Sequence, residues 1–338
     1  MAIPYRTRRV VKHTLAILGV ILLVALLVWL VWALWLGRFV VYSRDGARFD
    51  FDAPADNIAR EGSWVLEETV MASLYYNQGD DLLEQKKELG QMVGYYVTTQ
   101  ELEKNLPQVR EQAAKLEPGT PLMVDVKSIY GNFFYSSTVS ADRNTDIDVL
   151  AMDAFLQELD KSGLYTIARL PAFRDFNYGL NHVQDGLPTA GGYLWMDSSR
   201  CYWLNPASQG TITYLEHIIA ELRGLGFDEV VFYDFYFPVT DQIVFSGDKT
   251  EALTQAAERL TATYGSDNFT VSFVGGTDFP LPAAHSRLYV ENAAAAEAST
   301  IALETGLENP SVYLVFLTDL HDTRFNDYSV LRPLSGAH

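Results

Sequence analysis

The sequence has almost no cysteine, since Cys201 stands alone among 338 residues. A single thiol can form no disulfide within the chain, and it rules out a zinc site built from several cysteines. The six histidines, at positions 13, 182, 217, 285, 321 and 338, show no spacing typical of metal ligands. The sequence therefore predicts no bound metal and no other cofactor.

Basic residues are scarce beyond Arg48. Seven of the 25 Lys and Arg residues and one of the 43 Asp and Glu residues lie at or before it, which leaves 18 basic and 42 acidic residues after it and a formal net charge of −24. Such a surface repels nucleic acid and anionic lipid. We therefore expect no nucleic-acid partner, and the simplest role for the acidity is to keep an exported domain in solution.

Ionisable side chains are missing altogether from residues 14–36, which read TLAILGVILLVALLVWLVWALWL. A helix rises ~1.5 Å per residue, so these residues span roughly 35 Å, whereas the hydrocarbon core of a bilayer is about 30 Å thick. Trp29, Trp32 and Trp35 lie near the end of the run, where an aromatic belt is typical. The run predicts a transmembrane helix over 14–36, with the lipid bilayer as its partner.

The orientation follows from the basic residues that precede the run, Arg6, Arg8, Arg9 and Lys12. Cationic flanks stay on the cytoplasmic side, so residues 1–13 are predicted to be a cytoplasmic tail and the large C-terminal part to be extracytoplasmic. A cleaved signal peptide is the alternative, but its apolar core is normally ~7 to 15 residues long. We therefore expect a single-pass protein of the cell membrane, with residues 37–87 as a lead-in segment in which FVVYSRDGARFDFD predicts a β-hairpin.

From residue 88 to 338, short apolar runs alternate with longer amphipathic ones. Seven runs predict strands, at 92–98, 121–126, 164–170, 228–235, 269–275, 287–292 and 312–319, and the segments between them predict helices. This alternation is typical of parallel strands joined by right-handed crossovers. Residues 89–334 number 246, close to the ~250 of a TIM-type (β/α)8 barrel.

The predicted fold class is thus an α/β protein with a TIM-type barrel, regular or incomplete. The eighth strand comes either from residues 38–75 or from the C-terminal YSVLRPL; the sequence does not decide between the two. An open doubly wound sheet is the structural alternative, although no Gly-rich phosphate loop follows the first predicted strand.

Candidate site residues stand where the predicted strands end, because TIM barrels carry their active sites at that end. A carboxylate inside VVFYDFYFP is costly to bury unless it is paired or used, which favours Asp234. Paired carboxylates suit glycoside hydrolysis, in which one protonates the leaving oxygen and another attacks or activates water. The predicted catalytic residues are Asp234, Glu291 and Asp125; the predicted substrate-binding residues are Lys127, Arg169, Trp195, Trp203, Tyr236 and Asp319. Structural ion pairs of Asp125 with Lys127 or Arg169 remain the alternative for those residues.

Four stretches resemble one known family, the putative glycoside hydrolase domain, a group of TIM barrels related to the α-amylase-type glycosidases. They are MVDVKSIYGNFFYSS, GLYTIARLPAFRDF, WMDSSRCYWLNP and GFDEVVFYDFYFP. The residues that match its motifs are Asp125, Lys127, Arg169, Asp175, Trp195, Trp203 and Asn205. The resemblance implies a TIM barrel and carbohydrate as the substrate class.

The chain also departs from the family's motifs. The family reads Phe-Asp-Tyr-x-Arg-Phe-Pro on its fourth strand, whereas here Asp234 lies one place later and Tyr236 takes the place of the Arg. A shift of one residue turns a side chain to the other face of a strand unless a bulge compensates. Three hypotheses follow: a membrane-anchored glycoside hydrolase acting on cell-envelope or environmental polysaccharide, a non-catalytic glycan-binding or envelope-scaffold barrel, and an interaction domain without affinity for sugars.

Overall fold

The structure is a computed structural model that describes residues 40–43, 46–49 and 89–336, together with Val24, Leu26 and Trp29. The chain divides into two compact units, residues 1–65 and 66–338. In the first unit, Val24, Leu26 and Trp29 are helical and exposed. The rest of the predicted span over 14–36 lies outside the described residues. Within the described part of the chain, no helix combines the length and the apolar character that crossing a membrane requires.

The first unit also contains a hairpin of two short strands, β1 (Val40–Ser43) and β2 (Gly46–Phe49). They pair antiparallel, with Val40 opposite Phe49 and Ser43 opposite Gly46. The hairpin lies where the alternating residues FVVYSRDGARFDFD predict one. The rest of the segment over 50–87 lies outside the described residues.

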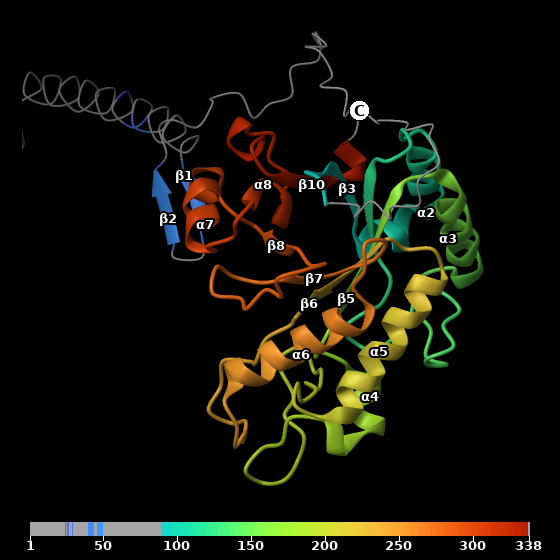
Figure 1. Cartoon of the computed structure of the whole chain (residues 1–338), viewed down its shortest axis with the longest axis vertical. Helices are drawn as coiled ribbons and strands as arrows, with labels where there is room; N and C mark the ends of the chain where they lie inside the picture. The colour runs from blue at the N-terminus through green and yellow to red at the C-terminus, as the bar shows by residue number, and fades with distance from the viewer. Residues whose placement is uncertain are drawn as a thin grey trace, which may run out of the picture. The chain divides into compact units, whose positions relative to one another are not determined.

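The second unit contains a closed barrel of eight parallel strands (Figure 1). Around the barrel the strands follow each other in chain order, and β10 closes the ring between β9 and β3. Their bounds are β3 (Val93–Val97), β4 (Pro121–Asp125), β5 (Tyr165–Pro171), β6 (Glu229–Tyr233), β7 (Thr270–Val274), β8 (Leu288–Glu291), β9 (Leu314–Leu317) and β10 (Ser329–Pro333). The TIM-type barrel predicted from the sequence is confirmed, and YSVLRPL supplies the eighth strand.

Helices connect the strands. They are α2 (Thr99–Ala113), α3 (Val149–Ser162), α4 (Phe176–Asn181), α5 (Gln209–Gly224), α6 (Lys249–Tyr264), α7 (Ala298–Glu304) and α8 (Pro310–Tyr313), with the 3-10 turns η2 (Val183–Asp185), η3 (Ala295–Glu297), η4 (Thr323–Phe325) and η5 (Leu334–Gly336). Side chains cap the longer ones at their first turn, such as Thr98 on α2 and Asp148 on α3. Each cap accepts a backbone N–H that has no partner within the helix, which fixes where the helix begins.

The barrel interior is filled by apolar side chains, among them Met123, Ile167, Val231, Val315 and Leu331. A second apolar layer packs the outer faces of the strands against the helices. Because the interior is packed and not hollow, only the two ends of the barrel offer polar side chains to one another.

The amino end of the barrel is closed by a buried ion pair. Arg287 Nη1 lies 2.6 Å from Glu229 Oε2, with side-chain exposures of 2% and 0%. Three hydroxyl groups also donate to the Glu229 carboxylate, those of Tyr165, Ser272 and Tyr289. Every oxygen of this carboxylate thus has partners, which is what allows a charge to be buried.

Candidate active site

Polar residues gather at the other end of the barrel, where the parallel strands reach their carboxyl ends. Asp125 is the last residue of β4, Tyr233 the last of β6 and Glu291 the last of β8. Arg169 stands opposite Asp125 in the register of β4 and β5. The topology therefore brings to one end residues that are up to 166 positions apart in the sequence.

Arg169 lies between two carboxylates. Its Nη1 is 2.9 Å from Asp125 Oδ1, its Nη2 is 2.5 Å from Glu291 Oε1, and its guanidinium lies 4.2 Å from the centroid of the Tyr233 ring. Burial alone would lower the pKa of Arg169, but the charges of Asp125 and Glu291 outweigh it and raise that pKa. The guanidinium is therefore permanently charged.

The two acids differ in accessibility. Asp125 is 6% exposed, and its Oδ2 also accepts bonds from the backbone N–H and the hydroxyl of Thr99, both at 2.8 Å. The Glu291 side chain is 31% exposed. Asp125 therefore holds Arg169 in place, whereas Glu291 is the member of the group that a ligand can reach.

Asp234 follows β6 directly and has a left-handed backbone, with φ of 52°. The expected inversion from one strand face to the other does not apply, because β6 ends at Tyr233 and the chain turns at Asp234. Aspartate adopts this conformation more readily than most residues. The turn itself sets the direction of the Asp234 side chain.

The pKa of Asp234 is raised, mainly by burial. Arg174 and Arg169 oppose this shift, while the charges of Glu291 and Asp197 add to it. Arg174 Nη1 lies 3.7 Å from Asp234 Oδ2. Asp234 is thus within electrostatic reach of Arg169 and Glu291. The raised pKa of Asp234 favours the protonated carboxyl that a general acid needs.

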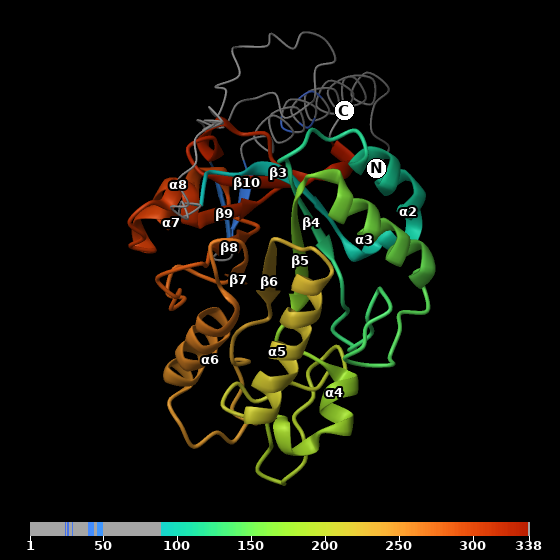
Figure 2. The ribbon, with the colours of Figure 1, turned by 45° about the vertical axis from the view of Figure 1, so that its right-hand side comes forward.

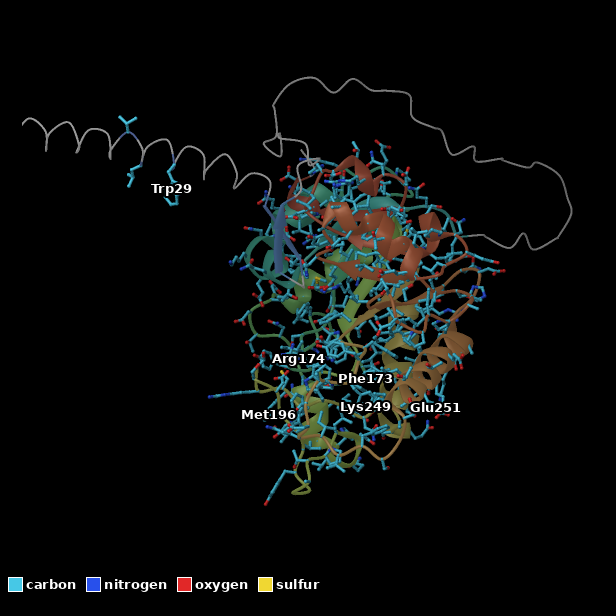
Figure 3. All side chains as sticks on the ribbon, turned by 90° about the vertical axis from the view of Figure 1, so that its left-hand side faces the viewer. Trp29, Phe173, Arg174, Met196, Lys249 and Glu251 are labelled. Atoms are coloured by element: carbon cyan, nitrogen blue, oxygen red, sulfur yellow. The ribbon has the colours of Figure 1, made fainter. Side chains whose placement is uncertain are left out.

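Arg174 is held by a second carboxylate from the long segment between β5 and α5. Its Nε lies 2.6 Å from Asp197 Oδ2, which also accepts a bond from the Trp203 indole N–H at 3.0 Å. Burial would raise the pKa of Asp197, but the backbone N–H of Cys201, the Trp203 indole and Arg174 together lower it. Figure 3 labels Arg174 and Met196, which both come from this segment.

Asp319 lies two residues beyond β9, at the same end of the barrel. Burial raises the pKa of the Tyr96 phenol on β3, and the charges of Asp319, Glu101 and Glu291 add to the shift. Tyr96 therefore lies within electrostatic reach of both Asp319 and Glu291. Within the described part of the chain, no group of three or more His, Cys, Asp or Glu side chains could hold a metal ion.

Lys127 does not belong to this group, contrary to the prediction that it binds substrate. Its side chain has no exposed surface, and its ammonium lies 2.6 Å from the equally buried carboxylate of Asp175. β4 ends at Asp125, and Lys127 lies beyond it, where it forms an isolated bridge with Phe133. Lys127 therefore links the loop after β4 to the loop after β5 through a buried ion pair.

The three predicted aromatic residues come together, but with different exposure. The Trp203 ring centroid lies 5.1 Å from that of Tyr236 and 6.4 Å from that of Trp195. Trp203 is only 3% exposed, so it cannot offer a ring face to a sugar as predicted. Tyr236 is 48% exposed and Trp195 is half-buried, so these two form the accessible part of the cluster.

The model of a family described as "Putative glycosyl hydrolase domain" matches residues 94–265, just over half of the chain. The chain belongs to this family. The matched part runs from β3 to the end of α6 and carries Asp125, Arg169, Arg174, Asp197 and Asp234. No curated protein matches the chain.

Solved structures with the same type of barrel include galactosidases. The galactosidase domain of an α-galactosidase-sucrose kinase has a TM-score of 0.51 at 11% identity, over 72% of this chain and 38% of its own. A hypothetical protein from Ruminiclostridium thermocellum has a TM-score of 0.46 at 21% identity, over 53% of this chain and 96% of its own. An α-galactosidase from Geobacillus stearothermophilus has a TM-score of 0.49 at 12% identity, over 72% of this chain and 39% of its own. This chain thus spans well under half the length of these galactosidase chains, and at such identity only the shared fold follows.

The structure therefore groups most of the predicted site residues and adds others. Asp125, Arg169, Glu291, Asp234 and Asp319 gather at the barrel end. Four residues of the site were not predicted from the sequence: Arg174, Asp197, Tyr233 and Tyr96. Arg174 and Asp197 stand inside two of the stretches that resemble the family, so a signal for them was present; the two tyrosines were hidden within apolar strands.

Proposed function

We propose that this protein is a membrane-anchored extracytoplasmic glycoside hydrolase that acts on cell-envelope or environmental polysaccharide. One observation carries the proposal: a permanently charged Arg169 pairs with Glu291 at the barrel end, within electrostatic reach of an Asp234 whose pKa burial raises. Glycoside hydrolysis needs two carboxyls with different roles, and a raised pKa suits the one that acts as general acid. Membership in a family of glycosyl hydrolase domains supports the same reading.

In the proposed reaction, Asp234 is the general acid and Glu291 the nucleophile. Asp234 transfers its proton to the glycosidic oxygen as the bond from that oxygen to the anomeric carbon breaks. A Glu291 oxygen bonds to the anomeric carbon, and water, losing a proton to the Asp234 carboxylate, then releases the sugar. Asp125 supports the reaction by holding Arg169, and Trp195 and Tyr236 offer rings on which sugars stack.

The test is a hydrolysis screen of the purified full chain against cell-envelope and plant polysaccharides. We expect release of reducing ends, with kcat/KM lower by about 10² to 10⁴-fold in Asp234→Asn, since that is the usual contribution of general acid catalysis. Lys115→Gln, an exposed change on the loop after α2, is the matched control. Equal activity in Asp234→Asn and the parent would contradict the assignment.

A second candidate is a glycan-binding barrel without catalysis. It is favoured by the pairing of both Asp125 and Glu291 with the same arginine, which ties up two of the candidate acids. This candidate predicts binding of a polysaccharide without turnover, with an affinity that Asp234→Asn leaves unchanged. Calorimetry on the same two proteins separates it from the hydrolase.

The proposed anchor rests on residues 14–36 and the basic residues before them. We expect the full chain to stay in the membrane fraction after an alkaline carbonate wash. Protease added to intact cells should digest the domain that follows residue 37. Release by carbonate, or protection of that domain, would contradict the proposed topology.

A further inference from the structure

The second unit has a pocket of about 460 Å³, lined by a different set of residues from the group around Arg169. Three segments form it: the loop between β4 and α3, the α4 region and the first turns of α5. Figures 1 and 2 both show α4 beside one end of α5. The lining residues include none of Asp125, Arg169, Asp234 and Glu291.

Three stacked rings form part of the wall. The Tyr178 ring lies 3.9 Å from Tyr214 at 18° and 4.1 Å from His182 at 14°, measured between centroids. Tyr214 is held in place, because its hydroxyl donates to Asp175 at 2.9 Å and Asp175 pairs with Lys127. Tyr214 is therefore the inner, anchored ring of the stack, and the exposed His182 is its outer ring.

The polar lining carries negative charge and no positive charge from lysine or arginine. Asp142 and Asp185 line the pocket, and neither forms an ion pair with a described residue. Asp185 is 6% exposed and accepts bonds only from uncharged groups, among them Ser208 at 2.6 Å and Tyr178 at 3.2 Å. A phosphate or a uronic acid would be repelled here, whereas a cationic group would be attracted.

Two polar side chains in the lining, both exposed, have no hydrogen-bond partner within the described chain. The side chains of Asn181 and His217 make no hydrogen bond to a described residue, and both line the pocket. Asn177 and Thr213 lie beside them. A ligand that satisfies this lining is rich in hydroxyl groups, since each hydroxyl both donates and accepts.

We propose that this pocket is an accessory saccharide-binding site that takes an amino sugar with a free ammonium group. The ammonium lies near Asp142, the hydroxyls bond to Asn181 and His217, and a ring face of the sugar packs on His182. Pockets of this size hold small ligands. The inference rests on the proposed function in that polysaccharide is the natural source of such a sugar, and the site would retain the polymer beside the barrel end.

The experiment is calorimetry of the purified full chain with a glucosamine tetramer. We expect the parent to bind it, with at least tenfold weaker binding in Asp142→Asn, because a charge-assisted bond is lost. Asp146→Asn, the same change at an exposed position of the same loop, is the matched control and should bind like the parent. Asn181→Ala, at an exposed position at the end of α4, is a second variant and should also weaken binding.

Each other outcome overturns the proposal. If the N-acetylated tetramer bound as tightly as the glucosamine tetramer, the ammonium would play no part in binding. If spermidine bound as tightly, the sugar would play no part. No binding, or binding that Asp142→Asn and Asn181→Ala leave intact, removes the site. Asp234→Asn distinguishes this inference from the proposed function, because it should lower kcat/KM for hydrolysis and leave this binding unchanged.

Discussion

Glu229 and Arg287 form an ion pair without contact with solvent at the amino end of the barrel. Removing one partner leaves the other charge buried and unpaired, so we expect Arg287→Met to lower the free energy of unfolding by about 3 to 5 kcal/mol. Lys115→Gln breaks an exposed pair with Glu111 and should change it by less than about 0.5 kcal/mol. Denaturant unfolding of both variants measures the difference, and equal stability of the two would show that the buried pair is dispensable.

The buried pairs also mark the limit of what the sequence could predict at the residue scale. Asp125, Asp234 and Glu291 could be selected because they close predicted strands. Lys127 was selected for the same reason, but its burial against Asp175 depends on a loop path that the local sequence pattern does not contain. Glu229 and Arg287 stand at the starts of strands, where a charge usually indicates a solvated edge, so only the closed barrel reveals their pairing.

Arg174 tunes the proposed general acid. Its positive charge lowers the pKa of Asp234, against the larger upward shift from burial. The substitution Arg174→Met should therefore raise the pKa of Asp234 further and keep the Asp234 carboxyl protonated to higher pH. The alkaline limb of the pH profile of kcat/KM should move upward, and a carbon-13 titration of the Asp234 carboxyl should show the same direction without requiring activity. A downward shift in the titration would contradict the assignment.

At the scale of elements, the seven predicted strands match observed ones because each is a continuous apolar run that a parallel barrel buries on both faces. The longer helices were equally predictable from apolar spacings of three and four residues. Helix α4 was missed because six residues, FNYGLN, are too few to show a period. It depends on Asp175, which caps it and also pairs with Lys127.

Glu221 on α5 anchors the loop between β4 and α3. Its carboxylate accepts bonds from the Tyr135 hydroxyl at 2.8 Å and the Ser137 hydroxyl at 2.6 Å, and from both the backbone N–H and the hydroxyl of Thr138. Burial would raise the pKa of Glu221, but these donors lower it. Since the native pKa lies below that of the unfolded chain, the stabilisation is present above the ordinary pKa of about 4.3 and is lost as the pH falls.

We therefore expect Glu221→Gln to lower the free energy of unfolding by about 1 to 2 kcal/mol at pH 7, since bonds to a charged acceptor are exchanged for bonds to a neutral one. The difference from the parent should shrink as the pH falls below about 4. Unfolding curves at pH 7, 5 and 3.5 measure it, with Glu111→Gln on the exposed face of α2 as control. A difference that grows toward acid pH would have the wrong sign.

At the scale of the whole molecule, the barrel is closed by its last strand. β10 pairs with β3 on one side and with β9 on the other, so residues 93–97 and 329–333 lie side by side although they are separated by more than two hundred positions (Figure 1). The sequence did not decide which of two segments supplies this strand, because SVLRP is short, contains an arginine and ends in proline. Its pairing is decided by closure, since a ring of parallel strands leaves no unpaired edge.

A chain that stops at residue 328 should therefore fail to fold as the parent does. It would expose the edges of β3 and β9 and the apolar side chains that Val330 and Leu331 cover, and exposed strand edges pair with those of other chains. We expect aggregation and loss of the cooperative thermal transition, seen by light scattering and circular dichroism. A chain that lacks only residues 337 and 338 is the control, because β10 and η5 remain intact. If the shorter chain melted cooperatively as a soluble monomer, seven strands would suffice and closure by β10 would not be what stabilises the barrel.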